Sequence, residues 1–312
     1  MSALGRSRGQ REGEYPVGEK PLARVQPAFR DQIGLPVVLL LACALSLLTF
    51  ALLLFRIDAQ SFWWDEALSF HRASGSISYI LSNQIRVRDV VTIDQHPPLY
   101  FLLLHFALRL FGASEFALRF PSAAASLLLV PVSYQLGRAW FSRQVGLGAA
   151  LFSGVSPFLV AYGQEARPYA QAALLGGISL YLVRKALDAG GERWYLGYFL
   201  VALVALFTHY LVAVLLALEV ALLGGYLVWR RRRLLLLGVP LAALALPVWG
   251  YLSQRYHAML VEKAQYSPVD MLREVAIAFS LGPAAANQSQ WVPCVVGLSL
   301  LLAVGAWASR QA

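Results

Sequence analysis

The sequence predicts an all-α membrane protein, a bundle of about eight transmembrane helices. Of its 312 residues, 58% are hydrophobic and only 14% are charged, whereas soluble domains carry roughly 25% charged residues. The mean hydropathy is +0.59. Apolar residues form long runs, and the basic residues lie in short clusters between them, where they set membrane topology. This distribution argues against nucleic acid as a partner, although the net charge is +9.

Apolar runs that are long enough to cross a bilayer, which takes about 20 residues, recur along the chain. The first run, 34–55, is too long and too far from the N-terminus for a cleaved signal peptide. The stretch 194–229 is long enough for two helices, and His209 lies near its middle. The other predicted spans are 121–137, 144–163, 168–183, 234–253 and 291–308.

These runs divide the chain into three predicted parts. Residues 1–33 are rich in Arg, Gly, Pro and Glu, which predicts a disordered basic tail. Residues 34–253 form the membrane core. Residues 254–312 contain an outer loop, with an interfacial helix predicted at 267–281, and the final span.

The Lys and Arg clusters predict the orientation of the bundle. The basic tail places the N-terminus in the cytoplasm, so the segment 56–98 is expected outside. Later basic clusters are expected in the cytoplasm, at 138–143, 184–185 and 230–233. This holds only if the short apolar run 99–112 lies in the interface instead of crossing. We therefore expect interfacial helices in the first outer loop of a plasma-membrane protein.

The first outer loop carries an acidic pair, Asp65 and Glu66, directly after Trp63-Trp64. The tryptophans are typical of a membrane–water interface. An isolated acidic pair is more often solvated surface, but the large apolar neighbours hold this one against the membrane. A carboxylate placed there can accept a proton from an acceptor hydroxyl, which predicts a catalytic base.

The same loop ends in Asp94-Gln95-His96-Pro97-Pro98. Prolines are tolerated in the first helical turn and restrict the backbone there. They are expected to hold Asp94 and His96 rigidly at the membrane surface. The alternative is a plain helix start with a solvated histidine.

A second polar constellation joins two apolar runs, as Gln164-Glu165-Ala166-Arg167-Pro168-Tyr169. The planar fork of Arg167 suits a phosphate, and Glu165 can orient that fork. The alternative is an ion pair at a helix junction. His209 is a candidate because ionisable groups within membranes are often functional, although helix packing is an equal alternative. For Glu219, hydrogen bonding between helices is the favoured interpretation.

The acidic pair, the Asp-x-His-Pro-Pro-Leu stretch and the Gln-Glu-Ala-Arg-x-Tyr junction together resemble the GT-C membrane glycosyltransferases. The similar families are the protein O-mannosyltransferases, the aminoarabinose transferases acting on lipid A and the RgtA-like bacterial proteins. The resemblance covers roughly residues 62–249 and implies a GT-C fold. It also implies transfer of a sugar, with inversion, from a polyprenyl-phosphate donor to a lipid, glycan or protein acceptor at the non-cytoplasmic face.

The resemblance also implies roles for individual residues. Asp65 matches the catalytic base, with Glu66 beside it. Arg167 and His96 are expected to bind the donor phosphate, supported by Asp94, Glu165 and Tyr169. A divalent metal cation is a possible cofactor, with His209 and Asp94 as its expected ligands and Glu66 as a further candidate.

Two other functions stay open from the sequence. A transporter or flippase of lipid-linked substrates would also use ionisable residues in a helical bundle, but it would place them near the midplane, often between inverted repeats, and no repeat is present. A catalytically degenerate homologue is the other, because family members commonly run well beyond 312 residues. The chain is thus expected to be either a short member or a truncated copy.

Overall fold

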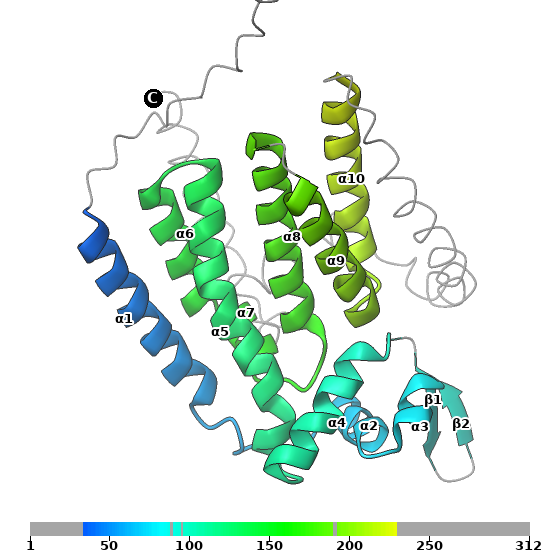
Figure 1. Ribbon diagram of the computed structural model, residues 1–312. Helices are drawn as coiled ribbons and strands as arrows, with labels where there is room; N and C mark the ends of the chain where they lie inside the picture. Colours follow the sequence, from blue (N-terminus) through cyan, green and yellow to red (C-terminus); the bar gives the residue numbers. More distant parts are fainter. Residues whose placement is uncertain (1–33, 88–89, 95, 190–191, 230–312) are drawn as a thin grey trace, which may run out of the picture.

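The computed structural model describes residues 34–87, 90–94, 96–189 and 192–229, and 79% of these residues are helical. The long helices run side by side as a bundle (Figure 1), with α5 at its centre in contact with α1, α6 and α8, while α9 and α10 pack on α8. The helical character of the chain is confirmed. The bundle helices are α1 (Leu35–Leu54), α5 (Glu115–Trp140), α6 (Arg143–Val155), α7 (Pro157–Gly163), α8 (Tyr169–Ala189), α9 (Glu192–Thr208) and α10 (Val212–Trp229).

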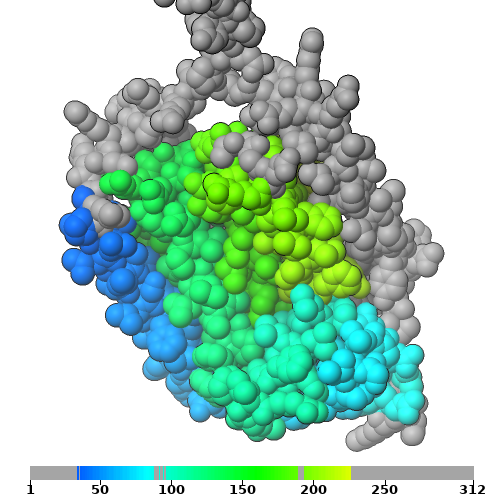
Figure 2. Space-filling view, in the orientation of Figure 1, coloured from blue at the N-terminus to red at the C-terminus, as the bar shows by residue number. Residues whose placement is uncertain are grey.

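The connecting segment, residues 56–114, covers one end of the bundle and is cyan in Figure 2. It contains an antiparallel hairpin in which Gln84 pairs with Ile93 and Val87 pairs with Val90. The all-α prediction missed this hairpin because its strands are only four residues long. The elements of the segment are α2 (Trp64–Ala73), α3 (Ile77–Leu81), β1 (Gln84–Val87), β2 (Val90–Ile93) and α4 (Leu99–Phe111).

Two described helices are long and apolar enough to cross a membrane, at Pro36–Leu54 and Glu115–Trp140. The pair α6 and α7 forms a third candidate span, bent by 55°. These helices confirm the predicted membrane character. The predicted tail (1–33), the spans at 234–253 and 291–308 and the interfacial helix at 267–281 lie outside the described residues.

Proline and serine account for two differences between the predicted and observed helix ends. The span predicted at 144–163 is broken at Pro157, because proline has no backbone N–H with which to continue the hydrogen bonding of α6. The Ser156 hydroxyl accepts the Leu159 N–H and so caps the start of α7. Helix α5 begins at Glu115, six residues before the predicted start, because Ser114 caps it through the Ala117 N–H.

Helix α4 is part of the connecting segment and lies at one end of the bundle (Figure 1). Its 13 residues rise about 20 Å, which is shorter than the roughly 30 Å hydrocarbon core. Leu103, Phe106 and Leu110 are exposed along one face, while Phe101 and Leu104 are buried. An apolar face left uncovered on a short helix supports the predicted interfacial placement.

The contact between α5 and α6 depends on glycine. A Cβ added at Gly146 would lie 2.6 Å from the carbonyl oxygen of Tyr134, whereas a Cβ at Gly148 meets no atom within 4 Å. We expect Gly146→Ala to lower the free energy of unfolding by about 1–3 kcal/mol through overpacking. Gly148→Ala is the matched control and is expected to raise it by about 0.5–1 kcal/mol. Thermal unfolding in detergent measures both, and equal effects would contradict this close packing.

Candidate active site

Glu66 is buried in an ion pair that joins α2 to α5. Arg119 donates from Nε to Glu66 Oε1 at 2.8 Å and from Nη2 to Oε2 at 2.6 Å. The backbone N–H of Ala166 donates to the same Oε1 at 2.9 Å. Only 1% of the Glu66 side chain is exposed. Because both carboxylate oxygens are engaged, the geometry favours a positioning role for Glu66, in contrast to the catalytic role predicted beside Asp65.

Contacts with α1 also hold the turn after α7 in place. The Gln164 side-chain amide donates to the carbonyls of Leu52, Leu53 and Phe55 at 3.0 to 3.1 Å. These carbonyls lie at the C-terminal end of α1, where the last carbonyls of a helix have no N–H partner within the helix. Gln164 and Glu66 together fix the backbone that carries Arg167.

Arg72 is the centre of a second buried network. It is fully buried, and its guanidinium lies 4.0 Å from the centre of the Phe101 ring. Nη1 donates to Asp94 Oδ2 at 2.8 Å and to the His96 carbonyl at 3.1 Å. Nη2 donates to the Ile80 carbonyl and to the Asn83 side chain. Arg72 therefore holds the loop that contains Asp94 and His96.

Asp94 orients the imidazole of His96. Its Oδ1 accepts both the backbone N–H and the ring Nδ1–H of His96, each at 3.0 Å. Burial alone would raise the pKa of Asp94, but hydrogen bonds and charge from His96, together with the charge of Arg72, outweigh it and lower the pKa to about 2. The carboxylate is thus ionised at neutral pH. Because Asp94 binds Nδ1, the other ring nitrogen of His96, Nε2, can face a second partner.

Arg167 meets the two predicted motifs of the connecting segment. Its Nη2 lies 3.3 Å from His96 Nε2 and 3.6 Å from Asp65 Oδ2. Its Nη1 donates to the Asp65 carbonyl at 3.5 Å, and its buried Nε has no partner among the described residues. The Arg167 side chain is 7% exposed and that of Asp65 is 34% exposed. The site thus pairs an accessible carboxylate with a shielded cation that has an unused donor.

Aromatic and imidazole rings close the site beside Arg167. The His209 ring centre lies 5.5 Å from that of His96 and 5.5 Å from that of Tyr169. The Arg167 guanidinium lies 5.9 Å from the Tyr169 ring centre. Burial, followed by the charges of His96 and Arg167, lowers the pKa of His209 to about 4, so its ring is neutral at pH 7. The structure thus brings together Asp65, Asp94, His96, Arg167, Tyr169 and His209.

Glu165 is half-buried near the other acidic residues of the site. Burial, and then the charge of Glu66, raises its pKa to about 7, although the charge of Arg167 opposes the shift. Ionisation therefore adds a negative charge beside Arg167 at neutral pH. Because the folded pKa lies above the ordinary value of 4.5, the contribution of Glu165 to stability falls as the pH rises from 4.5 to about 7.

We expect the affinity for an anionic donor to fall as the pH rises through the pKa of Glu165, about 7. An interaction of about 1.4 kcal/mol changes an affinity tenfold, so the expected change is up to about tenfold. Glu165→Gln should remove this dependence from 1/KM for the donor, measured across the pH range. Glu115→Gln, the same substitution in the first turn of α5, should retain it. A pH dependence that survives in Glu165→Gln would assign the titration to another group.

Arg72 and Arg119 were missed in the sequence, although both are buried in a chain with few charged residues. Arg119 lies next to the apolar run predicted at 121–137, and Arg72 lies in the first outer loop, where interfacial helices are expected. An unpaired buried cation is costly in either place. That cost is a signal that a partner exists, but it does not identify the partner. The structure identifies Asp94 and Glu66.

The expected metal site does not fit the residues that surround it. Within residues 34–229, with the gaps noted above, no three His, Cys, Asp or Glu side chains are close enough together to hold an ion. Asp94 is engaged by Arg72 and His96, and Glu66 is engaged by Arg119. Both carboxylates that the sequence predicted as ligands are therefore already paired with arginines.

Comparison with known proteins places these residues in a family. No curated protein matches the chain significantly. A family model described as dolichyl-phosphate-mannose-protein mannosyltransferase matches residues 95–251, about half of the chain. The match includes His96, Arg167, Tyr169 and His209 and begins after Asp65. The predicted resemblance is confirmed, and the chain belongs to the dolichyl-phosphate-mannose-protein mannosyltransferase family of membrane glycosyltransferases.

Proposed function

We propose that this protein is an inverting glycosyltransferase that moves a sugar from a polyprenyl-phosphate donor to an acceptor hydroxyl. The observation that carries the proposal is the distance of 3.6 Å between Asp65 Oδ2 and Arg167 Nη2. A base for the acceptor and a cation for the departing phosphate are the two groups that this transfer needs. Asp65 belongs to α2, which Figure 1 shows at one end of the bundle, and Arg167 belongs to the turn between α7 and α8 that meets it there.

The chemistry is a single displacement. Asp65 takes the proton of the acceptor hydroxyl, and the oxygen attacks the anomeric carbon of the sugar. The bond from that carbon to the phosphate oxygen breaks, and the phosphate leaves with the electron pair. Attack from the side opposite the leaving group inverts the configuration. Phosphate is a good leaving group and needs no general acid, so the site must supply positive charge, which Arg167 provides.

Donor binding and base activation are coupled through Arg167. Without donor, the guanidinium lies between Asp65 and His96. A phosphate forms a stronger, bidentate pair with arginine than a carboxylate at 3.6 Å does. When the phosphate takes this fork and the unused Nε, Asp65 is released to accept the acceptor proton. The site therefore favours proton transfer only when donor is present.

His96 has a supporting role in the same step. The chain Arg72–Asp94–His96 holds the Nδ1–H of the ring against Asp94 and directs Nε2 to Arg167. An imidazole held in this way keeps the Arg167 guanidinium in position while the contact between Arg167 and Asp65 changes.

The family and the site chemistry together define the proposed partners. The family description names dolichyl-phosphate mannose and protein, so we take mannose on a polyprenyl phosphate as the first donor to test and a protein, lipid or glycan hydroxyl as the acceptor. The basic clusters support a cytoplasmic N-terminus, and with it our proposal of a site on the non-cytoplasmic face of the plasma membrane. Placement at one end of the bundle favours this function over a transporter, whose site would be near the midplane.

The test uses the full chain in proteoliposomes. Labelled polyprenyl-phosphate mannose should give labelled acceptor, analysed across protein, lipid and glycan fractions. Nucleoside-diphosphate mannose, a donor without a lipid carrier, should give none. Empty liposomes control for carry-over. Transfer from the nucleotide donor alone would contradict the proposed donor class, and correctly folded protein that transfers from neither donor would indicate a degenerate homologue.

A further inference from the structure

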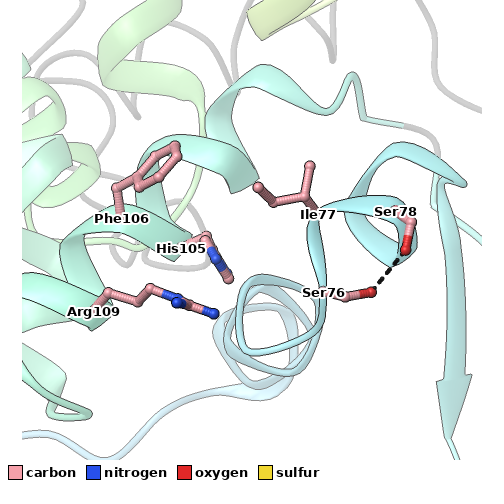
Figure 3. A pocket seen from close by; sticks show the side chains of 6 residues that line it. All are labelled: Ser76, Ile77, Ser78, His105, Phe106 and Arg109. Atoms are coloured by element: carbon pink, nitrogen blue, oxygen red, sulfur yellow. Dashed lines mark hydrogen bonds between the residues drawn. The ribbon is translucent and has the colours of Figure 1, made fainter.

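A cavity of about 390 Å³ lies between α3 and α4, in the connecting segment but at the other end of α4 from His96. Figure 3 shows α4 on one side of it and the start of α3 on the other. Its lining is Ser76, Ile77, Ser78, His105, Phe106 and Arg109. None of these side chains takes part in the network around Arg167, so the cavity is a separate feature.

One charged side chain, Arg109, makes this cavity suited to an anion. His105 is 5% exposed, and its Nδ1 donates to the carbonyl of Ala73 at 2.7 Å, because a carbonyl can only accept. With Nδ1–H used in this way, His105 fixes the wall of the cavity, and the charge for an anion comes from Arg109. Arg109 is exposed and forms no ion pair among the described residues. In Figure 3 both side chains extend from α4 toward α3, and the Ser76 and Ser78 hydroxyls, which lie 2.9 Å apart, point away from them.

The surroundings of the cavity are apolar and exposed. Phe106 is 58% exposed and Ile77 is 48% exposed, and both line the cavity itself. Leu103 and Leu110 continue the exposed apolar face of α4, and Leu81 does the same at the end of α3. A cationic cavity within an apolar face matches the two parts of a phospholipid, an anionic headgroup and its acyl chains. A free phosphate would use only the polar part.

We propose that the α3–α4 cavity binds the phosphate of an anionic membrane phospholipid, with Arg109 as its main charged contact. The exposed side chains of Ile77, Phe106 and Leu110 then lie against the acyl chains. Such a contact anchors the connecting segment, and with it the loop of Asp94 and His96, at the membrane surface. Lipid binding in this cavity does not depend on which sugar is transferred.

The test labels the full chain in nanodiscs with a phospholipid that carries a photoreactive group near its headgroup. Phosphatidylglycerol should label the peptides containing 76–78 and 105–109, and phosphatidylcholine should not. Arg109→Gln should reduce labelling about fivefold, the effect of one basic residue at an anionic surface. Arg86→Gln, which removes an exposed arginine of the same segment on β1, is the matched control and should label as wild type does.

Three results would overturn the proposal. Equal labelling by phosphatidylcholine would show that the headgroup charge is not recognised. Unchanged labelling in Arg109→Gln, with thermal unfolding as in wild type, would remove the proposed contact. Loss of labelling in excess inorganic phosphate would identify a free-anion site instead of a lipid site. Labelling requires no sugar transfer, so its outcome is independent of the transfer assay.

Discussion

Asp65→Asn is expected to lower kcat for sugar transfer by about 10²–10⁴-fold, the usual contribution of a positioned general base. Asparagine has nearly the same size as aspartate, and its amide oxygen can still face Arg167, but it does not accept a proton from the acceptor hydroxyl. KM for the donor should change little, because Arg167 and His96 are retained. Initial rates in proteoliposomes, with donor and acceptor varied separately, measure both constants.

Asp58→Asn is the matched control, since Asp58 is an exposed carboxylate of the same connecting segment. It should transfer sugar at the wild-type rate. If Asp65→Asn retains full kcat, Asp65 is not the base. If instead KM for the donor rises and kcat is unchanged, the contact between Asp65 and Arg167 serves donor binding alone.

Glu66→Gln is expected to have a large effect on folding. It leaves Arg119 as a buried cation without a counter-charge, which typically costs about 3–5 kcal/mol when one partner of a buried pair is removed. The Ala166 N–H also loses a charged acceptor, so the turn that carries Arg167 loosens. Thermal unfolding in detergent measures the stability, and transfer rates well below the unfolding temperature report on the turn.

A double variant distinguishes charge pairing from side-chain volume. Glu66→Met combined with Arg119→Met removes both charges, and part of the lost stability should return, because an apolar pair of similar size is tolerated where a lone charge is not. Glu115→Gln, a change in the same helix as Arg119, should cost less than about 1 kcal/mol. Wild-type stability of Glu66→Gln would show that the pair with Arg119 contributes little to folding.

Adjacent residues have separate roles here because of helix geometry. Asp65 and Glu66 occupy the first turn of α2, where consecutive side chains point about 100° apart. Glu66 consequently faces Arg119 inside the protein, and Asp65 faces Arg167 at an accessible site. The sequence identified the pair as important, but only the helix register assigned a different environment to each member.

The sequence alone determined the features that depend on local patterns. Long apolar runs predicted membrane helices, and the described spans at 36–54 and 115–140 confirm that character. Short motifs predicted the family, which the match over 95–251 confirms. The interpretation of Glu219 as a hydrogen-bonding residue between helices agrees with the Ser179 hydroxyl of α8, which donates to Glu219 Oε1 at 2.9 Å.

Only the tertiary structure decided which charges meet. Arg119 and Glu66 are 53 residues apart, and Arg167 and His96 are 71 residues apart, so no local spacing predicts either contact. A buried arginine requires a counter-charge, but the sequence does not indicate which of the several carboxylates of the chain supplies it. The packing of α2, α5 and the turn after α7 determines these pairs. Glu66 and Asp94 are buried against Arg119 and Arg72, whereas Asp65 lies near Arg167 and stays accessible.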